Sequence, residues 1–312
     1  MTSFEFLNMK GAFMSTVELS PQEQWLADRR KGIGGSDAPT VLGENRFTSR
    51  YELWAEKTGQ IEPDDLSDNE AVEFGHKLER IVLETLAERT GRTVDPWPQT
   101  ESVQHPTMHW MRCTPDGIQI DAERGMGLVQ AKTTSAFLSG DWSDEPPLSA
   151  QIQVQHEMEV MGKDWATLCV IIGGQSFKWF DIERNDRFID ALIQAEEKFW
   201  KLVESGTPPD VDFTESCARA IAKLHPLDNG EAIVMPAEAA QWDTELTDVK
   251  VRLKELEGTK RELESHIKAA IGDNTIGVLP DGSQYTWKTQ TRGAYEVKEC
   301  TYRVLRRSKG GK

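Results

Sequence analysis

What this sequence lacks excludes several classes of protein. Its four cysteines stand far apart, at positions 113, 169, 217 and 300, so no Cys-x-x-Cys pair is available for zinc or an iron–sulfur cluster. No apolar run approaches the roughly 20 residues that a membrane-spanning helix needs. The sequence therefore predicts a reduced, cytoplasmic protein with no contact to a membrane.

Positive charge is also scarce. The 312 residues include 36 Lys and Arg against 52 Asp and Glu, which gives a formal net charge of -16 at pH 7. This excludes a basic coat protein that holds nucleic acid by bulk charge. It does not exclude an enzyme acting on nucleic acid, because local patches decide contact and metal sites are themselves acidic. Neither a Gly-x-Ser-x-Gly element nor a Walker A loop is present, so acyl transfer and nucleotide binding have no support.

The hydrophobic pattern predicts mixed α/β structure. Helical spacing favours helices over 49–58, 70–90, 148–161 and 185–204. In the helix over 70–90 we expect Phe74, Leu78, Ile81 and Leu86 to be buried. A strand pattern over 110–134, interrupted by the turn-like sequence DAERGM, predicts a β-hairpin, and two further strands follow over 165–183.

Glycine and proline after position 205 predict a domain boundary. We expect a lead-in over 1–19, a main domain over 20–205 and a C-terminal extension over 206–312. From Trp242 to Ala270 the extension repeats apolar residues at alternating spacings of four and three, interrupted at Lys260, and a hairpin is predicted around Pro280–Gly282. Such a stripe more often packs within its own chain than against another chain, and the sequence leaves both possibilities open.

The first group of residues that could carry chemistry lies on the predicted hairpin. Residues i and i+2 of a strand point to the same face, so Gln130 and Lys132 project together, and the hairpin brings Asp116 alongside them. Metal-assisted phosphodiester hydrolysis uses carboxylates to hold Mg²⁺ and a lysine to orient water or neutralise charge. An ordinary hairpin with a solvated lysine would show the same short pattern.

Three more segments carry candidate residues. Glu79 shares a helix face with Gly75, where another chain segment or a ligand can approach closely; alternatively it is a solvated glutamate. The glycine-rich loop 32–37 follows basic residues and opens a helix, which suits either a phosphate site or a simple helix cap. Gln151 and Gln155 share a helix face that could touch a sugar–phosphate backbone or simply be solvated.

The order of these segments carries more information than any one of them. An R-x-x-G-I-G-G-S-D loop is followed by a helix ending in K-T-G, then by G-x-x-x-E, T-P-D-G, K-T-T and Q-x-Q-x-x-M. This order resembles the YqaJ-type viral recombinase family, which is grouped with lambda exonuclease in the PD-(D/E)xK nuclease superfamily. The resemblance covers about residues 20–205.

The resemblance implies a restriction-endonuclease-like α/β core, with a central mixed sheet flanked by helices. It implies a Mg²⁺-dependent 5′-to-3′ exonuclease, for which Mn²⁺ can substitute, that acts on double-stranded DNA ends and leaves a 3′ single strand for recombination. It also implies a ring-shaped homotrimer, a single-strand annealing protein as partner, and a phage or prophage origin in a bacterial cytoplasm.

Site residues follow from the resemblance position by position. Metal ligands would be Glu79, Asp116, the side chain at position 130 and the carbonyl of Ala131. Lys132 would be the catalytic lysine, and Gln155 the helix glutamine beside the active centre. The pocket for the 5′-phosphate would comprise Arg29, Ser36 and Thr114, with Arg30 as the adjacent alternative to Arg29.

Position 130 departs from the family pattern, because Gln130 stands where an acidic ligand is expected. An amide removes one negative charge and a strong ligand for a hard cation, so it should slow hydrolysis. A deliberate Glu→Gln replacement that traps uncut DNA and a native glutamine both explain it. The competing functions are the nuclease and a catalytically silent module that binds DNA ends and recruits a partner through the heptad helix. A purely structural coiled-coil protein leaves the ordered motifs of 29–158 unexplained.

Overall fold

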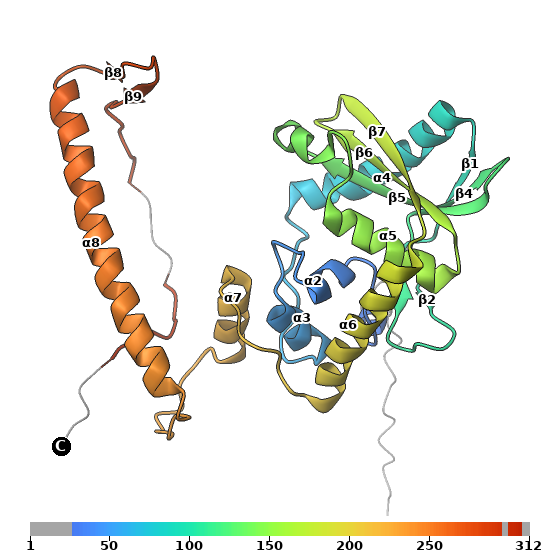
Figure 1. Cartoon of the computed structure of the whole chain (residues 1–312), viewed down its shortest axis with the longest axis horizontal. Coiled ribbons are helices and arrows are strands. Elements are labelled where there is room, and N and C mark those ends of the chain that lie inside the picture. The colour runs from blue at the N-terminus through green and yellow to red at the C-terminus, as the bar shows by residue number, and fades with distance from the viewer. Residues whose placement is uncertain (1–26, 295–298, 308–312) are drawn as a thin grey trace, which may run out of the picture. The chain divides into compact units, whose positions relative to one another are not determined.

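A computed structural model describes residues 27–294 and 299–307 of the protein. The predicted lead-in, residues 1–19, and the first residues of the predicted main domain lie outside this part of the chain. Contacts divide the chain into two compact units that separate between His225 and Pro226. Figure 1 shows the elements of each unit.

A mixed five-stranded sheet forms the centre of the first unit, in the order β1-β4-β5-β6-β7. Strands β5 and β6 are parallel, and every other neighbouring pair is antiparallel. The strands are β1 (Thr93–Pro96), β4 (Gly117–Asp121), β5 (Gly125–Thr134), β6 (Trp165–Ile172) and β7 (Ser176–Glu183). The mixed sheet flanked by helices confirms the predicted fold class.

The predicted hairpin forms, but it begins later than the sequence suggested. Strands β4 and β5 pair antiparallel, with Gly117 opposite Val129 and Asp121 opposite Gly125. The preceding strand, β3 (Arg112–Cys113), leaves the central sheet and pairs with β2 (Val103–Gln104) instead. Pro115 lies at the break, where its missing N–H cannot enter a ladder. This break places Thr114 and Asp116 in a short connection between two sheets.

Helices cover both faces of the central sheet (Figure 1). Helix α4 (Glu70–Thr90) packs Val82, Leu83 and Leu86 on one face, against Val129 and Cys169. Helix α5 (Leu148–Met161), which connects β5 to β6 through the 3₁₀ helix η1 (Ala136–Trp142), packs on the opposite face, against side chains that alternate with the first set along the strands. Strands β5, β6 and β7 therefore contribute side chains to both cores.

The expected stripe on α4 needs correction. Leu86 is buried, but Phe74 and Ile81 are 53% and 48% exposed, and the helix buries Val82 and Leu83 instead. The core contacts with Val129 and Cys169 come from Val82, Leu83 and Leu86. Phe74 and Ile81 are seven residues apart and lie on a different face of the helix from these three.

A second helical layer lies beside α5. Helices α2 (Ala38–Leu42), α3 (Arg50–Lys57), α6 (Asp186–Ser205) and α7 (Glu215–Leu224) form it. Indole Nε1 of Trp54 in α3 donates to the carbonyl of Leu202 in α6 at 3.2 Å, and Arg219 in α7 pairs with Glu52 in α3 at 2.9 Å. Because α7 packs on α3, the first unit continues to His225, beyond the predicted boundary at 205.

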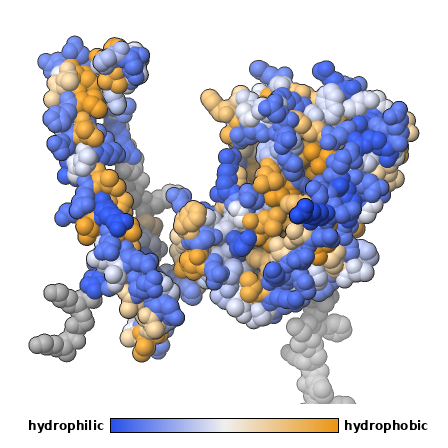
Figure 2. Space-filling view, viewed as in Figure 1, coloured by the Kyte–Doolittle hydropathy of each residue, from blue (hydrophilic) through white to orange (hydrophobic). Residues whose placement is uncertain are grey.

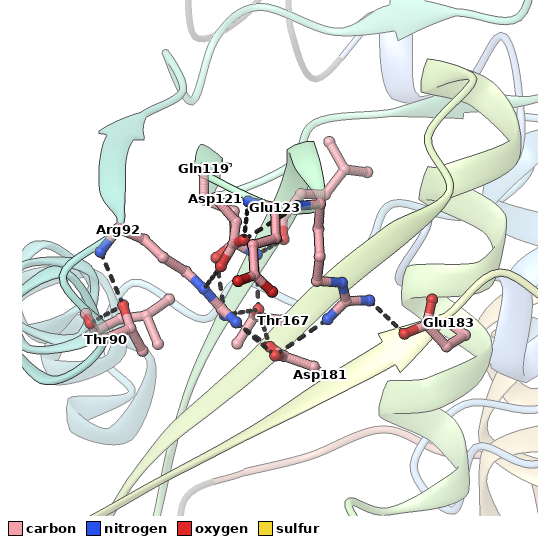
Figure 3. A network of polar contacts seen from close by, with 11 residues as sticks. Thr90, Arg92, Gln119, Asp121, Glu123, Thr167, Asp181 and Glu183 are labelled. Carbon is pink, nitrogen blue, oxygen red and sulfur yellow. Dashed lines mark hydrogen bonds and ion pairs between the residues drawn. The ribbon is translucent and has the colours of Figure 1, made fainter.

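Charged side chains cross-link one end of the central sheet (Figure 3). Arg92, just after α4, donates to both oxygens of Asp181 on β7, at 2.8 and 2.6 Å, and to Asp121 on β4 at 2.9 Å. Thr167 on β6 also donates to Asp181, at 2.6 Å. Three strands and the end of α4 are thus joined through one guanidinium group, which fixes the sheet at the end opposite to Lys132.

The second unit contains a long helix and a small hairpin. Helix α8 spans Ala239–Ile271, and strands β8 (Ile276–Val278) and β9 (Gln284–Thr286) pair antiparallel as predicted. Ile271, at the end of α8, is buried against Gly277 of β8. In the described part of the chain, every helix is too short or too polar to cross a membrane.

Candidate active site

Asp116 and Gln130 meet where the hairpin opens. The register sets Gly117 opposite Val129, so the preceding Asp116 lies next to Gln130 on β5. Oδ2 of Asp116 accepts a hydrogen bond from Nε2 of Gln130 at 2.5 Å and another from the backbone N–H of Ala131 at 2.7 Å. The backbone break at Pro115 therefore turns this carboxylate toward the middle of β5.

A pocket of about 240 Å³ opens beside this pair. Helix α4 contributes Glu79, whose Oε2 accepts from Gln99 at 2.9 Å. Gly75, one turn earlier, brings α4 close to β5, because a Cβ added there would lie 3.7 Å from Oγ1 of Thr133. The remaining predicted residues of this site also line the pocket, namely Asp116, Gln130, Ala131 and Lys132.

The surroundings of Asp116 in this pocket disfavour its ionised form. Burial raises the pKa of Asp116 to about 7; the charge of Lys132 acts against this rise and the charge of Glu79 adds to it. A buried carboxyl group held near neutrality is relieved when a cation enters beside it. The pocket therefore favours a bound positive charge.

The oxygen donors of the pocket fit a hard divalent cation. Oε1 of Gln130 is buried and has no hydrogen-bond partner among the described residues, so it is available as a ligand. With the carboxylates of Asp116 and Glu79 it provides the all-oxygen set that Mg²⁺ and Mn²⁺ prefer. No three His, Cys, Asp or Glu side chains gather into a metal cluster anywhere in residues 27–294 or 299–307. Asp116 and Glu79 are the two acidic side chains that line this pocket, and an acid at position 130 would be the third.

A second pocket, of about 110 Å³, lies at the glycine-rich loop. Arg29, Ser36 and Thr114 line it together, as the resemblance implied, and Arg112 joins them. Nη2 of Arg29 lies 3.4 Å from Oγ of Ser36. Two arginines and three hydroxyl side chains offer donors suited to a phosphate group in this small cavity, which the carboxyl groups of Asp37 and Glu157 also line.

Asp37 fixes the loop that forms this second pocket. Its Oδ2 accepts from Nζ of Lys57 at 2.6 Å and from the N–H of Gly34 at 2.9 Å. Burial opposes ionisation of Asp37, but Lys57 and Arg29 outweigh it and lower the pKa below the ordinary value. The K-T-G motif of the sequence thus supplies the lysine that holds the G-G-S-D loop in place.

Glu157 of α5 forms one wall of the second pocket. It is 1% exposed, and burial raises its pKa to about 7. Oε1 accepts from Nε2 of Gln153 at 2.9 Å, while Oε2 has no partner within the described chain. A Cβ added to Gly35 would lie 2.5 Å from Oε1, so only glycine lets the loop approach this carboxyl group.

One hydrogen-bond chain joins the two pockets. Nζ of Lys132, in the pocket of Asp116, donates to Oε1 of Gln153 at 2.9 Å. Gln153 lines the second pocket and donates to Glu157. The two cavities are therefore neighbouring parts of one site.

Comparison with known proteins identifies the family. A family model described as the YqaJ-like viral recombinase domain matches residues 24–164. Uncharacterized protein YqaJ of Bacillus subtilis (strain 168) is 33% identical over 283 residues, which cover 89% of this chain and 86% of that protein. The chain belongs to the YqaJ-like viral recombinase family. The resemblance inferred from the sequence is confirmed.

Two solved structures are similar at lower levels. An alkaline exonuclease, LHK-Exo, from Laribacter hongkongensis has a TM-score of 0.49 and 20% identity, with 65% of this chain and 99% of that chain covered. A phage related exonuclease from Haemophilus somnus 129PT has a TM-score of 0.43 and 12% identity, with 56% and 96% covered.

Two predicted site residues of this family member lie elsewhere. Arg30 forms an ion pair with Glu62 and does not line the phosphate-sized pocket, whereas Arg29 does. Gln155 donates to the carbonyl of Glu183 at 2.7 Å and accepts from the N–H of Asn185 at 2.9 Å. The amide nitrogen and the amide oxygen of Gln155 thus both bind the connection between β7 and α6. The glutamine of α5 that reaches Lys132 is Gln153.

Three residues of the site received no predicted role from the sequence, although Gln153 begins the Q-x-Q-x-x-M motif. Arg112 stands two residues before Thr114, so strand geometry already placed the two on one face. Gln153 and Glu157 are spaced i, i+4 and share a face of α5, as do Gln151 and Gln155, which were considered instead. Nothing in the local pattern distinguished these two faces.

Proposed function

We propose that this protein is a Mg²⁺-dependent 5′-to-3′ exonuclease that digests one strand from double-stranded DNA ends and leaves a 3′ single strand for phage-type recombination. The observation that carries the proposal is the hydrogen bond from Lys132 to Gln153, which joins a pocket with metal-ligand chemistry to a pocket with phosphate-binding chemistry. Membership of the viral recombinase family supports recombination as the setting.

The first pocket would hold the metal. Asp116, Glu79 and Oε1 of Gln130 supply its ligands, with the carbonyl of Ala131 as a further donor. A bound Mg²⁺ would polarise the scissile phosphodiester and lower the pKa of attacking water. Lys132 is held by Gln153 at the border of the two pockets, where its ammonium group orients that water or neutralises charge that develops on the phosphate.

The second pocket explains why cleavage would start at an end. Arg29, Arg112, Ser36 and Thr114 offer charged and hydroxyl donors to the terminal 5′-phosphate. A cavity of about 110 Å³ is large enough for a terminal phosphate group. Seating this group would place the adjoining phosphodiester toward Lys132. The 5′-phosphate therefore acts as the positioning group for each cut.

Gln130 favours a second candidate function, a catalytically silent module that binds DNA ends. Its amide leaves two carboxylates at the metal pocket and donates a hydrogen bond to Asp116, as an ionised glutamate could not. The proposed nuclease then turns over slowly with Gln130 and faster after the substitution Gln130→Glu. In the silent module, binding of the end is the whole activity.

Digestion and binding of defined DNA ends separate the two functions. Linear duplexes with a 5′-phosphate or a 5′-hydroxyl are incubated with Mg²⁺ and either the unmodified chain or Gln130→Glu, and nucleotide release is followed. The nuclease proposal expects Gln130→Glu to digest phosphorylated ends at least about a hundredfold faster. Release by neither protein, with preferential binding of phosphorylated ends by both, supports the silent module.

Adjacent arginines supply the matched control for the phosphate pocket. Arg29→Ala should abolish the preference for 5′-phosphate, while Arg30→Ala should keep it, because Arg30 pairs with Glu62 outside the pocket. Equal loss in both variants would mean that general positive charge, and not the pocket, holds the DNA end.

The wider setting follows from the same proposal. A nuclease that exposes 3′ single strands needs a protein that anneals them, so a single-strand annealing protein is the expected partner. We expect the protein to act in the cytoplasm of a bacterial host, with Mn²⁺ able to replace Mg²⁺ in the oxygen-lined pocket. A homotrimeric ring would keep the enzyme on its substrate between cuts.

A further inference from the structure

Helix α8 carries an apolar stripe that the described residues leave exposed. Six of its members are 42% to 65% exposed: Trp242, Leu246, Val249, Leu253, Leu256 and Leu263. The hairpin β8–β9 packs only against the end of the helix, at Ile271. Apolar colouring recurs along α8 in Figure 2. The described residues of the second unit, 226–294 and 299–307, therefore leave this stripe uncovered.

The stripe has the spacing of a coiled coil. Leu246, Leu253, Lys260 and Ile267 fall at positions a, and Trp242, Val249, Leu256, Leu263 and Ala270 fall at positions d. The helix has 33 residues and is about 50 Å long, which accommodates about four heptads. Lys260 is the single charged residue in the seam, and one polar residue at position a fixes the register of paired helices at some cost in stability.

The flanking charges indicate what the partner is. In a parallel coiled coil, position g of one helix lies beside position e of the following heptad in the other helix. If α8 pairs with itself in register, Glu245 meets Lys250 of the second copy. One heptad later, Arg252 meets Glu257 of the second copy. Both pairs have opposite charges, and the next two are Thr259 with Glu264 and His266 with Ile271, which do not repel.

The first heptad contains the one unfavourable neighbour. Glu238, at the start of α8, would lie beside Asp243 of the second copy. Arg307 forms an ion pair with Asp243 at 2.7 Å, and this contact offsets the repulsion. The flanking charges are thus self-complementary along the stripe, and the like charges of the two Lys260 side chains are the cost of setting the register.

We propose that α8 forms a parallel, in-register coiled coil with α8 of a second copy of this chain. The exposed stripe supplies the buried seam, Lys260 sets the register, and the Glu245–Lys250 and Arg252–Glu257 pairs set the orientation. This inference is independent of the proposed nuclease function, because none of its residues belongs to the first unit.

Disulfide trapping in the full-length chain tests the seam. The exposed Cys300 is first replaced by serine, and the other three cysteines are buried. Val249→Cys at position d should then form a disulfide-linked dimer under mild oxidation, because parallel in-register helices bring this residue beside its own copy. Val251→Cys, at the outer position f, is the matched control, since Val249 and Val251 are 49% and 53% exposed. It should form dimers at least tenfold more slowly.

Exchanging the charges at positions 245 and 250 in the Val249→Cys chain tests whether the two paired helices are parallel. Glu245→Lys and Lys250→Glu should each slow trapping about fivefold, because each sets like charges opposite one another. The two changes combined restore opposite charges only in a parallel pair, so trapping should return to its original rate. Glu245 and Lys250 are five residues apart and are not neighbours on one helix surface, so restoration cannot come from within α8.

Three results would overturn the proposal. Trapping that is equally fast at positions 249 and 251 would indicate random collision. No trapping at 249 would mean that the stripe is covered by its own chain or by a different protein. Failure of the double exchange to restore trapping would exclude the parallel arrangement.

Discussion

Gln130 holds Asp116 by a hydrogen bond in which the amide nitrogen is the donor and the carboxylate is the acceptor, at 2.5 Å. A glutamate at position 130 can make this contact only when one of the two carboxyl groups is protonated. The amide therefore stabilises the metal-free pocket, and the same replacement removes a negative ligand. Stability without metal and affinity for metal should change in opposite directions at this position.

Gln130→Glu should thus lower the melting temperature in EDTA. It should also increase the rise in melting temperature that addition of Mg²⁺ or Mn²⁺ produces. Placing a third carboxylate in the pocket costs about 1–3 kcal/mol, which corresponds to a fall of several degrees in a chain of this size. Saturation at 100 times the dissociation constant returns about 2.7 kcal/mol. Differential scanning fluorimetry across metal concentrations measures both effects.

Gln175→Glu is the control for this experiment, since Gln175 lies exposed in the turn between β6 and β7 and adds the same charge at a residue that does not line the pocket. Its melting temperature should change little with or without metal. A Gln130→Glu protein that responds to metal no more than the Gln175→Glu control would contradict the assignment of metal ligands.

Lys132→Met should separate binding from turnover. The methionine keeps an apolar stem of similar length but loses the ammonium group that Gln153 holds. In the Gln130→Glu chain we expect nucleotide release to fall by about 100- to 10,000-fold, while binding of 5′-phosphorylated duplex, measured by fluorescence anisotropy, falls less than tenfold. Lys201→Met, on the exposed surface of α6, should leave both unchanged. Parallel losses of binding and turnover would reduce Lys132 to a DNA contact.

The local sequence pattern predicted the helices and strands well, but it did not predict which of their side chains face the site. The helix over 148–161 coincides with α5, and the four-and-three spacing of its apolar residues is enough for that. Which of Gln151, Gln153 and Gln155 reaches the site depends on how α5 rests on β6 and α6. Those contacts join residues far apart in the sequence, and no local signal contains them.

The two arginines at the loop show the same limit. The motif favours Arg29 and leaves Arg30 as the adjacent alternative, and the ion pair between Arg30 and Glu62 decides between them. Likewise, α4 was recognised from its periodicity, but only the position of the sheet determines that Val82 is buried and Ile81 exposed. The ordered motifs succeeded because each one combines a residue type with a backbone feature, such as glycine in a close loop.

The buried pair of His156 and Glu196 should make stability fall at alkaline pH. Both side chains are fully buried, and Nδ1 lies 2.7 Å from Oε1. Burial disfavours the charged imidazole, but Glu196 outweighs it and raises the pKa of His156 to about 9. Because this value exceeds the ordinary 6.5, the stabilisation is complete below about pH 6.5 and is lost as pH rises through 9, with a total of the order of 3 kcal/mol.

Urea unfolding between pH 6 and pH 10 measures this contribution. Glu196→Gln should lower the free energy of unfolding most at pH 6, and the difference from the unmodified chain should shrink toward pH 10. Taking the difference cancels the contribution of groups that titrate independently of this pair. His109, which pairs with Glu204 on the surface, gives the control, because His109→Gln should shift the curve little at any pH. A constant difference for Glu196→Gln would contradict a charged His156.

Gly35→Ala should damage the phosphate pocket by a steric mechanism. The new methyl group would lie 2.5 Å from Oε1 of Glu157, so either the loop or the buried carboxyl group must move. We expect binding of 5′-phosphorylated duplex to weaken at least tenfold, because Ser36 follows directly in the displaced loop. Gly140→Ala is the matched control, since nothing lies within 4 Å of a Cβ added there. Combining Gly35→Ala with Glu157→Ala removes the obstructing atoms and should recover most of the binding. If the double variant binds no better than Gly35→Ala alone, the loop requires glycine for a reason other than its approach to Glu157.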